Sequence, residues 1–439
     1  MLHIYNILMA VTALIGWPLI VLAAVFSSKR RKSILQRLGL KDLPTIGQSA
    51  EIRPIWVHAL SVGEVLSALP LVSGLKKQFK KRPIIFSVST LSGFGIAATQ
   101  VAPLVDELCF FPYDIIPSIR RVADRIDPAM VVLVETDIWP NFLAIMQKRN
   151  VPVALVNARL SNKSYKGYRR LSLFSRTVFG MLTAVGAQIA VDAEKFQALG
   201  VASSKLRVTG SLKFDQQLSE DLPENIADLN SALERSGQLR IFLAGSIHKG
   251  EEVFLGQAFL RLKHKIPKLG MLVVPRDPAD GRFVWRHFDE IGLNTVLATE
   301  LNNLDLPANW EVVVVAAMGV LRDMYSLCEV AFVGGSMVAS GGHNPLEPAA
   351  LKKPILFGTD MGDFMAAAEP LLKAGGAYQV VDEEDLYQKA VLLFTDDKRR
   401  ENTGAKAYTV FCANQGAVSR TINQLSDLMD ADNMVENDV

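Results

Sequence analysis

Two glycine pairs and several polar residues stand between Val333 and Ala349, after one apolar run and before an alanine-rich stretch. The run 329–333 is typical of a buried strand, so the glycine pairs fall where backbone N–H groups can meet a phosphate at a helix start. Pro345 suits the first turn of that helix, and Glu347 would lie at its positive end, where a carboxylate can accept hydrogen bonds from ribose hydroxyls. The segment predicts a nucleotide site, although a glycine-rich turn with a helix-capping acid would use the same residues.

Two further strand ends in the same half of the chain carry groups that can bind anions. Gly-Ser-Ile-His-Lys-Gly-Glu-Glu at 245–252 follows an apolar run and precedes a helical stretch, which makes a second place to hold a phosphate or a carboxylate. His248 could instead hydrogen-bond within the turn. Arg276 follows the next strand and suits an anionic sugar or phosphate, with a salt bridge to Asp277 or Asp280 as the alternative.

A carboxylate that could act as a base stands in the first half of the chain. A strand, a glycine loop and a helix start run from Trp56 to Glu64. A carboxylate at that place can remove the proton from an attacking hydroxyl. A first-turn acid favoured only by the helix dipole is an equal interpretation of Glu64 on its own.

Polar groups also follow the neighbouring strands of this half. The spacing of Glu135 and Asp137 would permit a metal pair, but no His or further carboxylate accompanies them, so a metal is disfavoured. Asn-Ala-Arg-Leu-Ser at 157–161 ends another strand. Tyr and basic residues at 165–170 would suit phosphates on an acceptor, unless they form only a solvated face.

Apolar runs alternate with helical stretches along the whole chain, which predicts α/β domains with mostly parallel sheets. The strands expected in the first domain are 52–59, 84–88, 107–111, 130–134, 153–157, 187–191 and 206–209. Those expected in the second domain are 240–244, 271–274, 295–298, 311–315, 330–333 and 354–357. Such sheets bind ligands at the carboxyl ends of their strands, so two of them facing a cleft predict a bisubstrate enzyme.

The expected organisation has five segments. They are a membrane anchor at 1–28, a first Rossmann-like domain at 29–210, a polar linker at 211–237, a second Rossmann-like domain at 238–403 and a C-terminal helix at 404–439 that packs back on the first domain.

The anchor rests on the uncharged run 7–26, whose 20 residues match the thickness of a bilayer's hydrocarbon core. Basic residues follow the run at 29–32, and no charged side chain precedes it, which predicts catalytic domains on the cytoplasmic side. A cleaved signal peptide would show the reverse order of charges. A buried or interfacial helix with a kink at Trp17 and Pro18 is the alternative.

The charge of the chain is divided. The net charge of +2 over 439 residues combines 26 Lys and Arg against 12 Asp and Glu in 27–210 with 21 against 33 in 211–439. This division argues against nucleic-acid binding and favours an anionic membrane surface or substrate for the first half. The widely spaced Cys109, Cys328 and Cys412 are expected to be small buried residues in a reducing compartment, without a structural disulfide.

Five of these segments occur together and in order. They are Trp-Val-His-Ala-Leu-Ser-Val-Gly-Glu at 56–64, Glu-Thr-Asp-Ile-Trp-Pro-Asn at 135–141, Asn-Ala-Arg-Leu-Ser at 157–161, Gly-Ser-Ile-His-Lys-Gly-Glu-Glu at 245–252 and Gly-Gly-His-Asn-Pro-Leu-Glu-Pro-Ala at 341–349. The set closely resembles the 3-deoxy-D-manno-octulosonic acid (Kdo) transferase family of lipopolysaccharide synthesis. The resemblance implies a GT-B fold, CMP-Kdo as donor, a lipid A precursor at the inner membrane as acceptor, and inversion at the anomeric carbon without metal or cofactor.

The resemblance also implies roles for single residues. Glu64 matches the family's catalytic base, and Glu135 matches a second acidic residue that helps to place the acceptor. The donor-binding residues implied in this way are Gly245, Ser246, His248, Arg276, Gly335, Ser336, Gly342, Asn344 and Glu347. The acceptor-binding residues are Ser61, Gly63, Trp139, Arg159 and Ser161. Where the family usually has Pro-Arg-His-Pro and then Glu-Arg-Phe, this chain has Pro-Arg-Asp-Pro-Ala-Asp-Gly-Arg-Phe, which leaves the contacts of Asp277 and Arg282 open.

Two alternatives belong to other classes. One is a GT-B glycosyltransferase that uses a UDP-sugar on a lipid-linked acceptor. The other is a membrane-tethered binding protein with an inactive sugar-nucleotide pocket, which the presence of both Glu64 and Glu135 disfavours.

Overall fold

The computed structural model describes residues 4–7, 9, 11–12, 16, 28–45, 52–215, 222–237, 240–302 and 304–437. The chain forms two compact units, unit 1 with Met1–Gln217 and Gln415–Val439, and unit 2 with Leu218–Asn414. The apolar run at 7–26 lies largely outside the described residues. Among the helices that are described, none is long and apolar enough to cross a membrane.

Unit 1 is built on a seven-stranded parallel sheet with the strand order β3-β2-β1-β4-β5-β6-β7. Its strands are β1 Ile55–Ala59, β2 Ile84–Val88, β3 Glu107–Phe110, β4 Met130–Val134, β5 Val153–Ala158, β6 Ala184–Ala187 and β7 Leu206–Val208. The central strands are buried on both faces, which explains why they read as continuous apolar runs.

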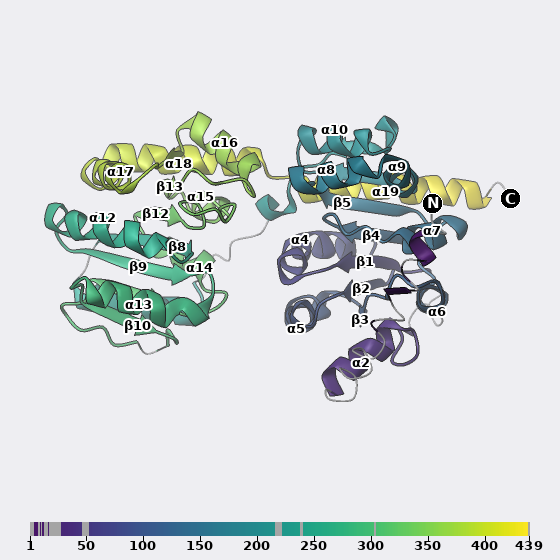
Figure 1. The fold of residues 1–439 in the computed structure, drawn as a ribbon, viewed down its shortest axis with the longest axis horizontal. Coiled ribbons are helices and arrows are strands. Elements are labelled where there is room, and N and C mark those ends of the chain that lie inside the picture. The colour runs from purple at the N-terminus through teal and green to yellow at the C-terminus, as the bar shows by residue number, and fades with distance from the viewer. Residues whose placement is uncertain are drawn as a thin grey trace. The chain divides into compact units, whose positions relative to one another are not determined.

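Helices cover both faces of this sheet (Figure 1). One face packs against α4 Val62–Gln78, α5 Leu91–Gln100 and α19 Ala417–Asn437. The other packs against α6 Ile116–Ile126, α7 Pro140–Lys148, α9 Ser172–Gly180 and α10 Ala190–Ala198. The remaining helices of unit 1 are α2 Ser28–Arg37, α8 Asn162–Arg170 and the short turns η1 Ala102–Leu104, η2 Ser203–Lys205 and η3 Leu212–Asp215.

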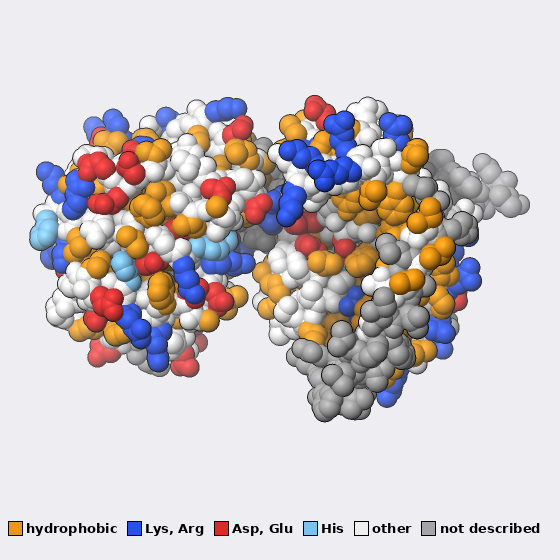
Figure 2. Space-filling model, in the orientation of Figure 1, with side chains coloured by type: hydrophobic (Ala, Val, Ile, Leu, Met, Phe, Trp, Pro, Cys, Tyr) orange, Lys and Arg blue, Asp and Glu red, His pale blue; other side chains and the backbone are white. Residues whose placement is uncertain are grey.

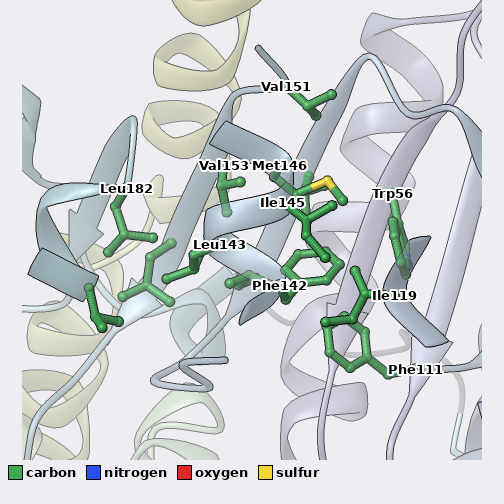
Figure 3. Close-up of a cluster of buried hydrophobic side chains, with 14 of the residues drawn as sticks. Trp56, Phe111, Ile119, Phe142, Leu143, Ile145, Met146, Val151, Val153 and Leu182 are labelled. Atoms are coloured by element: carbon green, nitrogen blue, oxygen red, sulfur yellow. The ribbon is translucent and has the colours of Figure 1, made fainter. Parts of the chain in front are cut away.

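The core on the α6 and α7 face centres on aromatic side chains (Figure 3). Trp56 of β1 lies 5.1 Å from the ring of Phe142 and 5.6 Å from that of Phe111, measured between centroids. The indole Nε1–H of Trp56 donates to the hydroxyl of Ser87 on β2 at 2.8 Å. This core therefore joins β1 to β2, to α7 and to the segment after β3 that carries Phe111.

The strand predicted at 187–191 is wrong, because the strand ends at Ala187 and α10 begins at Ala190. The true strand has the small residues Ala-Val-Gly-Ala, which do not stand out as an apolar run. Small residues are needed here because a Cβ on Gly186 would lie 2.9 Å from both the Gln424 side chain of α19 and the Thr209 hydroxyl.

The C-terminal helix α19 is tied to unit 1 through its first turn. The carboxylate of Asp215 accepts hydrogen bonds from the backbone N–H groups of Gly416 and Val418, each at 2.6 Å. The stretch 404–439, predicted as one C-terminal helix, thus contains parts of two helices, the end of α18 Asp397–Ala413 in unit 2 and α19 in unit 1. Likewise the stretch 211–237 contains η3 of unit 1 and α11 Glu224–Ser236 of unit 2.

Unit 2 repeats the architecture with a parallel sheet in the order β10-β11-β9-β8-β12-β13-β14. Its strands are β8 Arg240–Ile247, β9 Leu269–Pro275, β10 Thr295–Ala298, β11 Val312–Val315, β12 Val330–Val333, β13 Ile355–Phe357 and β14 Ala377–Gln379. Its helices besides α11 and α18 are α12 Glu251–Lys265, α13 Gly281–Glu290, α14 Leu321–Met324, α15 Leu346–Ala350, α16 Met365–Ala374 and α17 Glu383–Thr395, with short turns η4 Pro278–Asp280 and η5 Tyr325–Leu327. Sequence analysis missed β14.

Each sheet reverses its strand order at its centre. In unit 1 the chain leaves β1 toward β2 on one side and later returns to β4 on the other, and in unit 2 the same holds for β8, with β9 and β12 as its neighbours. Loops diverge at such a point, and ligands of open α/β sheets bind at the carboxyl ends of the two strands that flank it. These two strand pairs therefore determine where the candidate site residues must be sought.

Candidate active site

Glu64 lies in the first turn of α4, which follows β1 in unit 1. Its carboxylate accepts a hydrogen bond from the backbone N–H of Leu60 at 2.5 Å, so the side chain folds back toward the end of the strand. Burial raises the pKa of this carboxyl from 4.5 to about 7, the N–H of Leu60 opposes the rise, and the nearby charges of Glu135 and Asp137 add to it. A carboxylate with this pKa can accept a proton at neutral pH.

Glu135 and Asp137 follow β4, the strand next to β1. Glu135 adopts a left-handed backbone with φ of 61°, which is strained for a residue with a side chain. Its Oε1 accepts from the Nδ2 of Asn157 at 3.4 Å and lies 3.8 Å from the Nζ of Lys213. Asn157, at the end of β5, is also left-handed, with φ of 53°. The residues after β4 and at the end of β5 thus both have left-handed backbones and meet through the Glu135 carboxylate.

The turn after β4 is held from two sides. The hydroxyl of Thr136 donates to the backbone carbonyl of Arg159 at the end of β5. On the other side, the Oδ2 of Asp137 lies 2.8 Å from the Nε2 of His58, a fully buried residue of β1. Tertiary contacts of this kind sustain a strained backbone that the local sequence would not adopt alone.

The residues assigned to acceptor binding lie around this turn in different settings. The backbone N–H of Ser61 also faces the Glu64 carboxylate, and Gly63 is exposed, with open space where a side chain would stand. Trp139 precedes α7, and its Nε1 is buried with no hydrogen-bond partner among the described residues. Ser161 caps α8 by accepting from the N–H of Ser164 at 3.1 Å. Ser61 and Gly63 are close to Glu64 already in the sequence. Ser161 has a structural role as the N-cap of α8.

In unit 2, two imidazoles meet at the ends of β8 and β12. The Nε2 atoms of His248 and His343 lie 2.8 Å apart, so one ring donates the shared proton and the other accepts it. Burial, together with the positive charges of Arg276 and His248, lowers the pKa of His343 to about 4. The pair is therefore not doubly protonated at neutral pH. Gly335 has φ of 67°, and a Cβ there would lie 2.9 Å from the His343 ring, so glycine is required for this contact.

The backbone amides after β12 are already occupied, which corrects the expectation that they are free for a phosphate. The fully buried carboxylate of Glu251 accepts from the N–H groups of His248, Gly335, Ser336 and Met337 at 2.7–3.0 Å. The glycine-rich loop thus surrounds an anion supplied by the chain itself, and a ligand must be held by other groups.

The second glycine pair is also occupied by internal contacts. The N–H of Gly341 donates to Asp360, and that of Gly342 donates to the carbonyl of Gly335, each at 2.8 Å. The side chain of Ser336 is fully buried, donates to the carbonyl of Val333 and accepts from the N–H of Gly358. Ser336 and Gly342 therefore shape the loop and do not present a free group to a ligand.

The other donor-binding candidates are arranged along the same edge. Asn344 and Glu347 form a bracket, with Nδ2 of Asn344 donating to the carboxylate at 3.2 Å. Glu347 lies in the first turn of α15, as expected. Ser246, at the end of β8, is left-handed, with φ of 56°. Gly245 is buried within the strand, where a Cβ would lie 2.3 Å from the hydroxyl oxygen of Tyr325, so its role is to admit that phenol.

The region where the sequence departs from the family pattern has defined contacts. Arg276 is exposed at the end of β9 and close enough to His343 to affect its charge. Asp277 caps η4 by accepting from the N–H of Ala279 at 2.9 Å. Asp280 pairs with Lys249 at 2.8 Å, which joins the loop after β9 to the loop after β8. Arg282 is exposed on α13. The predicted alternative, a salt bridge from Arg276 to Asp277 or Asp280, is therefore not found among the described residues, since Asp280 pairs with Lys249 instead.

Sequence analysis did not single out His58, Asp137, Glu251 or His343 as site residues. All four stand within the five quoted motifs, so a signal existed, but their roles depend on partners distant in the chain. The expectation that all three cysteines are buried is confirmed for Cys109 and Cys328 and wrong for Cys412, which is exposed. In the parts of the chain that are described, no group of three or more His, Cys, Asp or Glu side chains could hold a metal ion.

Proteins of known family resemble this chain in sequence and in fold. Residues 32–216 match the family model described as 3-deoxy-D-manno-octulosonic-acid transferase (kdotransferase). A Haemophilus influenzae 3-deoxy-D-manno-octulosonic acid transferase is 30% identical over 425 residues, which cover 95% of this chain and 97% of the relative. The enzyme of the same name from Bordetella pertussis is 29% identical, covering 85% and 87%.

The chain belongs to the Kdo transferase family. It is therefore a glycosyltransferase. The fold also resembles that of the Staphylococcus aureus MnaA–UDP structure, with a TM-score of 0.59 at 16% identity over 86% of this chain and 97% of that one. A UDP-GlcNAc 2-epimerase from Neisseria meningitidis gives 0.59 at 12% identity over 85% and 100%. The prediction of two Rossmann-like domains of GT-B type is thereby confirmed for the two units.

The four backbone N–H groups that donate to Glu251 make this residue a specific target for mutation. Glu251→Gln should lower the free energy of unfolding by about 2–3 kcal/mol, because one amide oxygen cannot accept what two carboxylate oxygens accept and its NH2 group faces N–H donors. Urea denaturation followed by circular dichroism measures this loss. Glu252→Gln is the matched control, since Glu252 is also buried but accepts from the single N–H of Gly250, and it should cost about 1 kcal/mol. Equal losses of unfolding free energy in the two variants would contradict the role of Glu251 as the acceptor that holds this loop.

Proposed function

We propose that this chain transfers Kdo from CMP-Kdo to the tetraacyldisaccharide lipid A precursor (lipid IVA), with inversion and without a metal, and that Glu64 is the general base. The observation that carries the proposal is the position of Glu64 in the first turn of α4, directly after the central strand β1, where its carboxylate accepts from the N–H of Leu60 and burial raises its pKa to about 7. Membership in the Kdo transferase family supports the sugar that is transferred.

In the proposed reaction, Glu64 takes the proton of the primary hydroxyl of the acceptor glucosamine. The hydroxyl oxygen forms a bond to the anomeric carbon of Kdo while the bond from that carbon to the phosphate oxygen of CMP breaks. The electron pair of the broken bond leaves with CMP, and attack from the opposite side inverts the configuration. Glu135 is proposed to place the acceptor, supported by its position on the strained turn beside Glu64.

The donor is proposed to bind unit 2 along the edge that carries Ser246, the His248–His343 pair and the Asn344–Glu347 bracket. Because the amides of Gly335 and Ser336 serve Glu251, the charge of the leaving phosphate is assigned to Arg276 with the imidazole N–H groups. Glu347 is left to accept hydrogen bonds from the ribose. Gly245, Ser336 and Gly342 act by shaping the loops.

The acceptor is proposed to meet the basic helices α8 and α9 of unit 1. No Asp or Glu stands between Asp137 and Asp192, and Lys163, Lys166, Arg169 and Arg170 of α8 are all exposed. Figure 2 shows Lys and Arg side chains gathered over α8, with hydrophobic side chains next to them. Leu171 and Leu173 follow directly and are 61% and 70% exposed. Positive charge beside exposed leucines suits a phosphorylated, acylated acceptor in an anionic inner-membrane surface.

The proposal includes a location at the cytoplasmic side of the inner membrane. The uncharged run at 7–26 would anchor the chain in the inner membrane, and the basic residues after it would keep the catalytic units on the cytoplasmic side.

Purified full-length protein should convert CMP-Kdo and lipid IVA to products whose mass exceeds that of lipid IVA by whole Kdo increments, measured by mass spectrometry. CMP should raise the melting temperature in a thermal-shift assay and UDP should not. Protection by UDP together with an absence of Kdo increments would favour a UDP-sugar enzyme on a lipid-linked acceptor.

Glu64→Gln should lower kcat about 10²–10⁴-fold, because the amide cannot take the proton. For the native protein, kcat/KM should fall about tenfold per pH unit below pH 7, since the folded-state pKa of about 7 leaves the base protonated there. Steady-state rates between pH 5 and 9 measure both effects.

Two controls separate chemistry from folding in that variant. The dissociation constant of CMP should be unchanged. Because the carboxyl pKa is raised on folding from 4.5 to about 7, its ionisation costs stability as pH rises through that window, so Glu64→Gln should be at least as stable as the native protein at pH 8. Substantial turnover by a folded Glu64→Gln variant would reject Glu64 as the base.

The double variant Arg169→Ala/Arg170→Ala should raise the KM for lipid IVA about tenfold or more and leave the KM for CMP-Kdo unchanged, since each lost phosphate contact involves a charge-assisted hydrogen bond. An acceptor stripped of its phosphates is the matched control and should abolish the difference between native and variant protein. An equal effect of the variant on both acceptors would show that these arginines do not bind phosphate.

A further inference from the structure

The strand β1, which precedes the proposed base Glu64, carries a buried histidine that has no part in the reaction as described. His58 of β1 is 0% exposed, and its ring stacks on Phe111 with centroids 3.9 Å apart and planes at 22°. Its Nδ1 is 3.0 Å from both the carbonyl oxygen and the hydroxyl of Ser87 on β2. Its Nε2 is 2.8 Å from the Oδ2 of Asp137. The ring is thus fixed by the strands and the aromatic core.

The partners of His58 define which nitrogen carries a proton toward the turn. An ionised carboxylate only accepts hydrogen bonds, so the Nε2 of His58 carries a proton and donates it to Asp137, whatever the state of Nδ1. The side chain of Asp137 is 13% exposed, so this bond is largely shielded from water. A charge-assisted hydrogen bond of this length is among the stronger polar contacts in proteins.

The residue that this bond restrains belongs to the strained turn. Asp137 stands two positions after Glu135, whose φ of 61° requires support from outside the turn. Thr136 provides one such contact through the carbonyl of Arg159, and His58 provides the other through Asp137. The two contacts come from β5 and β1, on opposite sides of β4. The turn is therefore clamped across the centre of the sheet.

We propose that His58 and Asp137 are a positioning pair, in which the buried imidazole fixes the 135–137 turn and holds the carboxylate charge of Asp137 beside the proposed base Glu64. The inference rests on the proposed function of Glu64. It assigns to Asp137 no contact with substrate and no proton transfer. The pair acts through Glu64, by keeping that carboxylate strongly basic, and through Glu135, by fixing its direction.

The charges around Glu64 support this role. Negative charge near a carboxylate disfavours its ionisation, and both Glu135 and Asp137 raise the pKa of Glu64. Glu135 is compensated by Lys213 at 3.8 Å, and Asp137 interacts with the partly buried guanidinium of Arg37. Among the described residues, the charged and titratable groups around Glu64 and its two acidic neighbours include His58, Lys213, Arg37, Asp114 and Tyr168.

Asp137→Asn tests the charge while keeping an oxygen that can accept from Nε2 of His58. The acid limb of the kcat/KM profile should move to lower pH by ~0.5 unit or more, because the base loses a negative neighbour. The plateau rate should fall about 2- to 3-fold, because a base whose pKa is ~0.5 unit lower takes the proton less readily. The KM for CMP-Kdo and the melting temperature should stay close to native values. If the pair served only to stabilise the fold, Asp137→Asn would lower the melting temperature and leave the acid limb of the kcat/KM profile unchanged.

His58→Gln and His58→Asn form a matched pair for the hydrogen bond. The Gln side chain can set its NH2 group near the position of Nε2 and keep the bond to Asp137, whereas the Asn amide reaches only the position of Nδ1 and Ser87. His58→Gln should retain most of the native rate, and His58→Asn should lose at least tenfold in kcat. Equal rates in two folded variants would overturn the role of the bond.

The outcomes separate this inference from the proposed function. An active Glu64→Gln variant would reject the proposed function of Glu64 as the general base. An inactive Glu64→Gln variant together with an unmoved acid limb in Asp137→Asn would leave the base in place and overturn the positioning pair. Because Asp137 is partly exposed, its variant provides this result even if the His58 variants fail to fold.

Discussion

Glutamates at equivalent places in the two units hold the loops at the centre of each sheet. Glu64 and Glu251 both lie in the first turn of the helix that follows a central strand, β1 in unit 1 and β8 in unit 2. Parallel strands end in backbone N–H groups that the sheet does not pair, and a carboxylate in the next turn can accept from them. This carboxylate-to-amide contact sets the course of the chain at both candidate sites.

The same contact has opposite chemical consequences in the two units. Glu251 is fully buried, and its carboxylate accepts hydrogen bonds from four backbone N–H groups, which hold the surrounding loop in place. Glu64 accepts only from Leu60 and Ser61, and burial, together with the charges of Glu135 and Asp137, raises its pKa to about 7. The number of donors around each carboxylate thus separates a structural anion from a candidate base.

Much of the fold could be predicted because parallel strands covered on both faces are continuous apolar runs. Runs such as 84–88 and 130–134 coincide with β2 and β4. The strand β6 was displaced because its residues are small where α19 packs closely at Gly186, and β14 was missed because it is a three-residue edge strand of mixed burial. In these two cases the neighbour, and not the segment, decides the residue type.

The sequence by itself determined the alternation of elements, the family and the local motifs, because each depends on residues close together in the chain. Glu64 and Glu347 could be placed at helix starts for that reason. Only the tertiary structure decided which polar groups are free to act. It paired His58 with Asp137 across 79 positions and Glu251 with the amides of a loop 84 or more positions away, and it put the second imidazole, His343, against the first. These contacts arise where the strand order of a parallel sheet reverses, which joins segments that no local pattern connects.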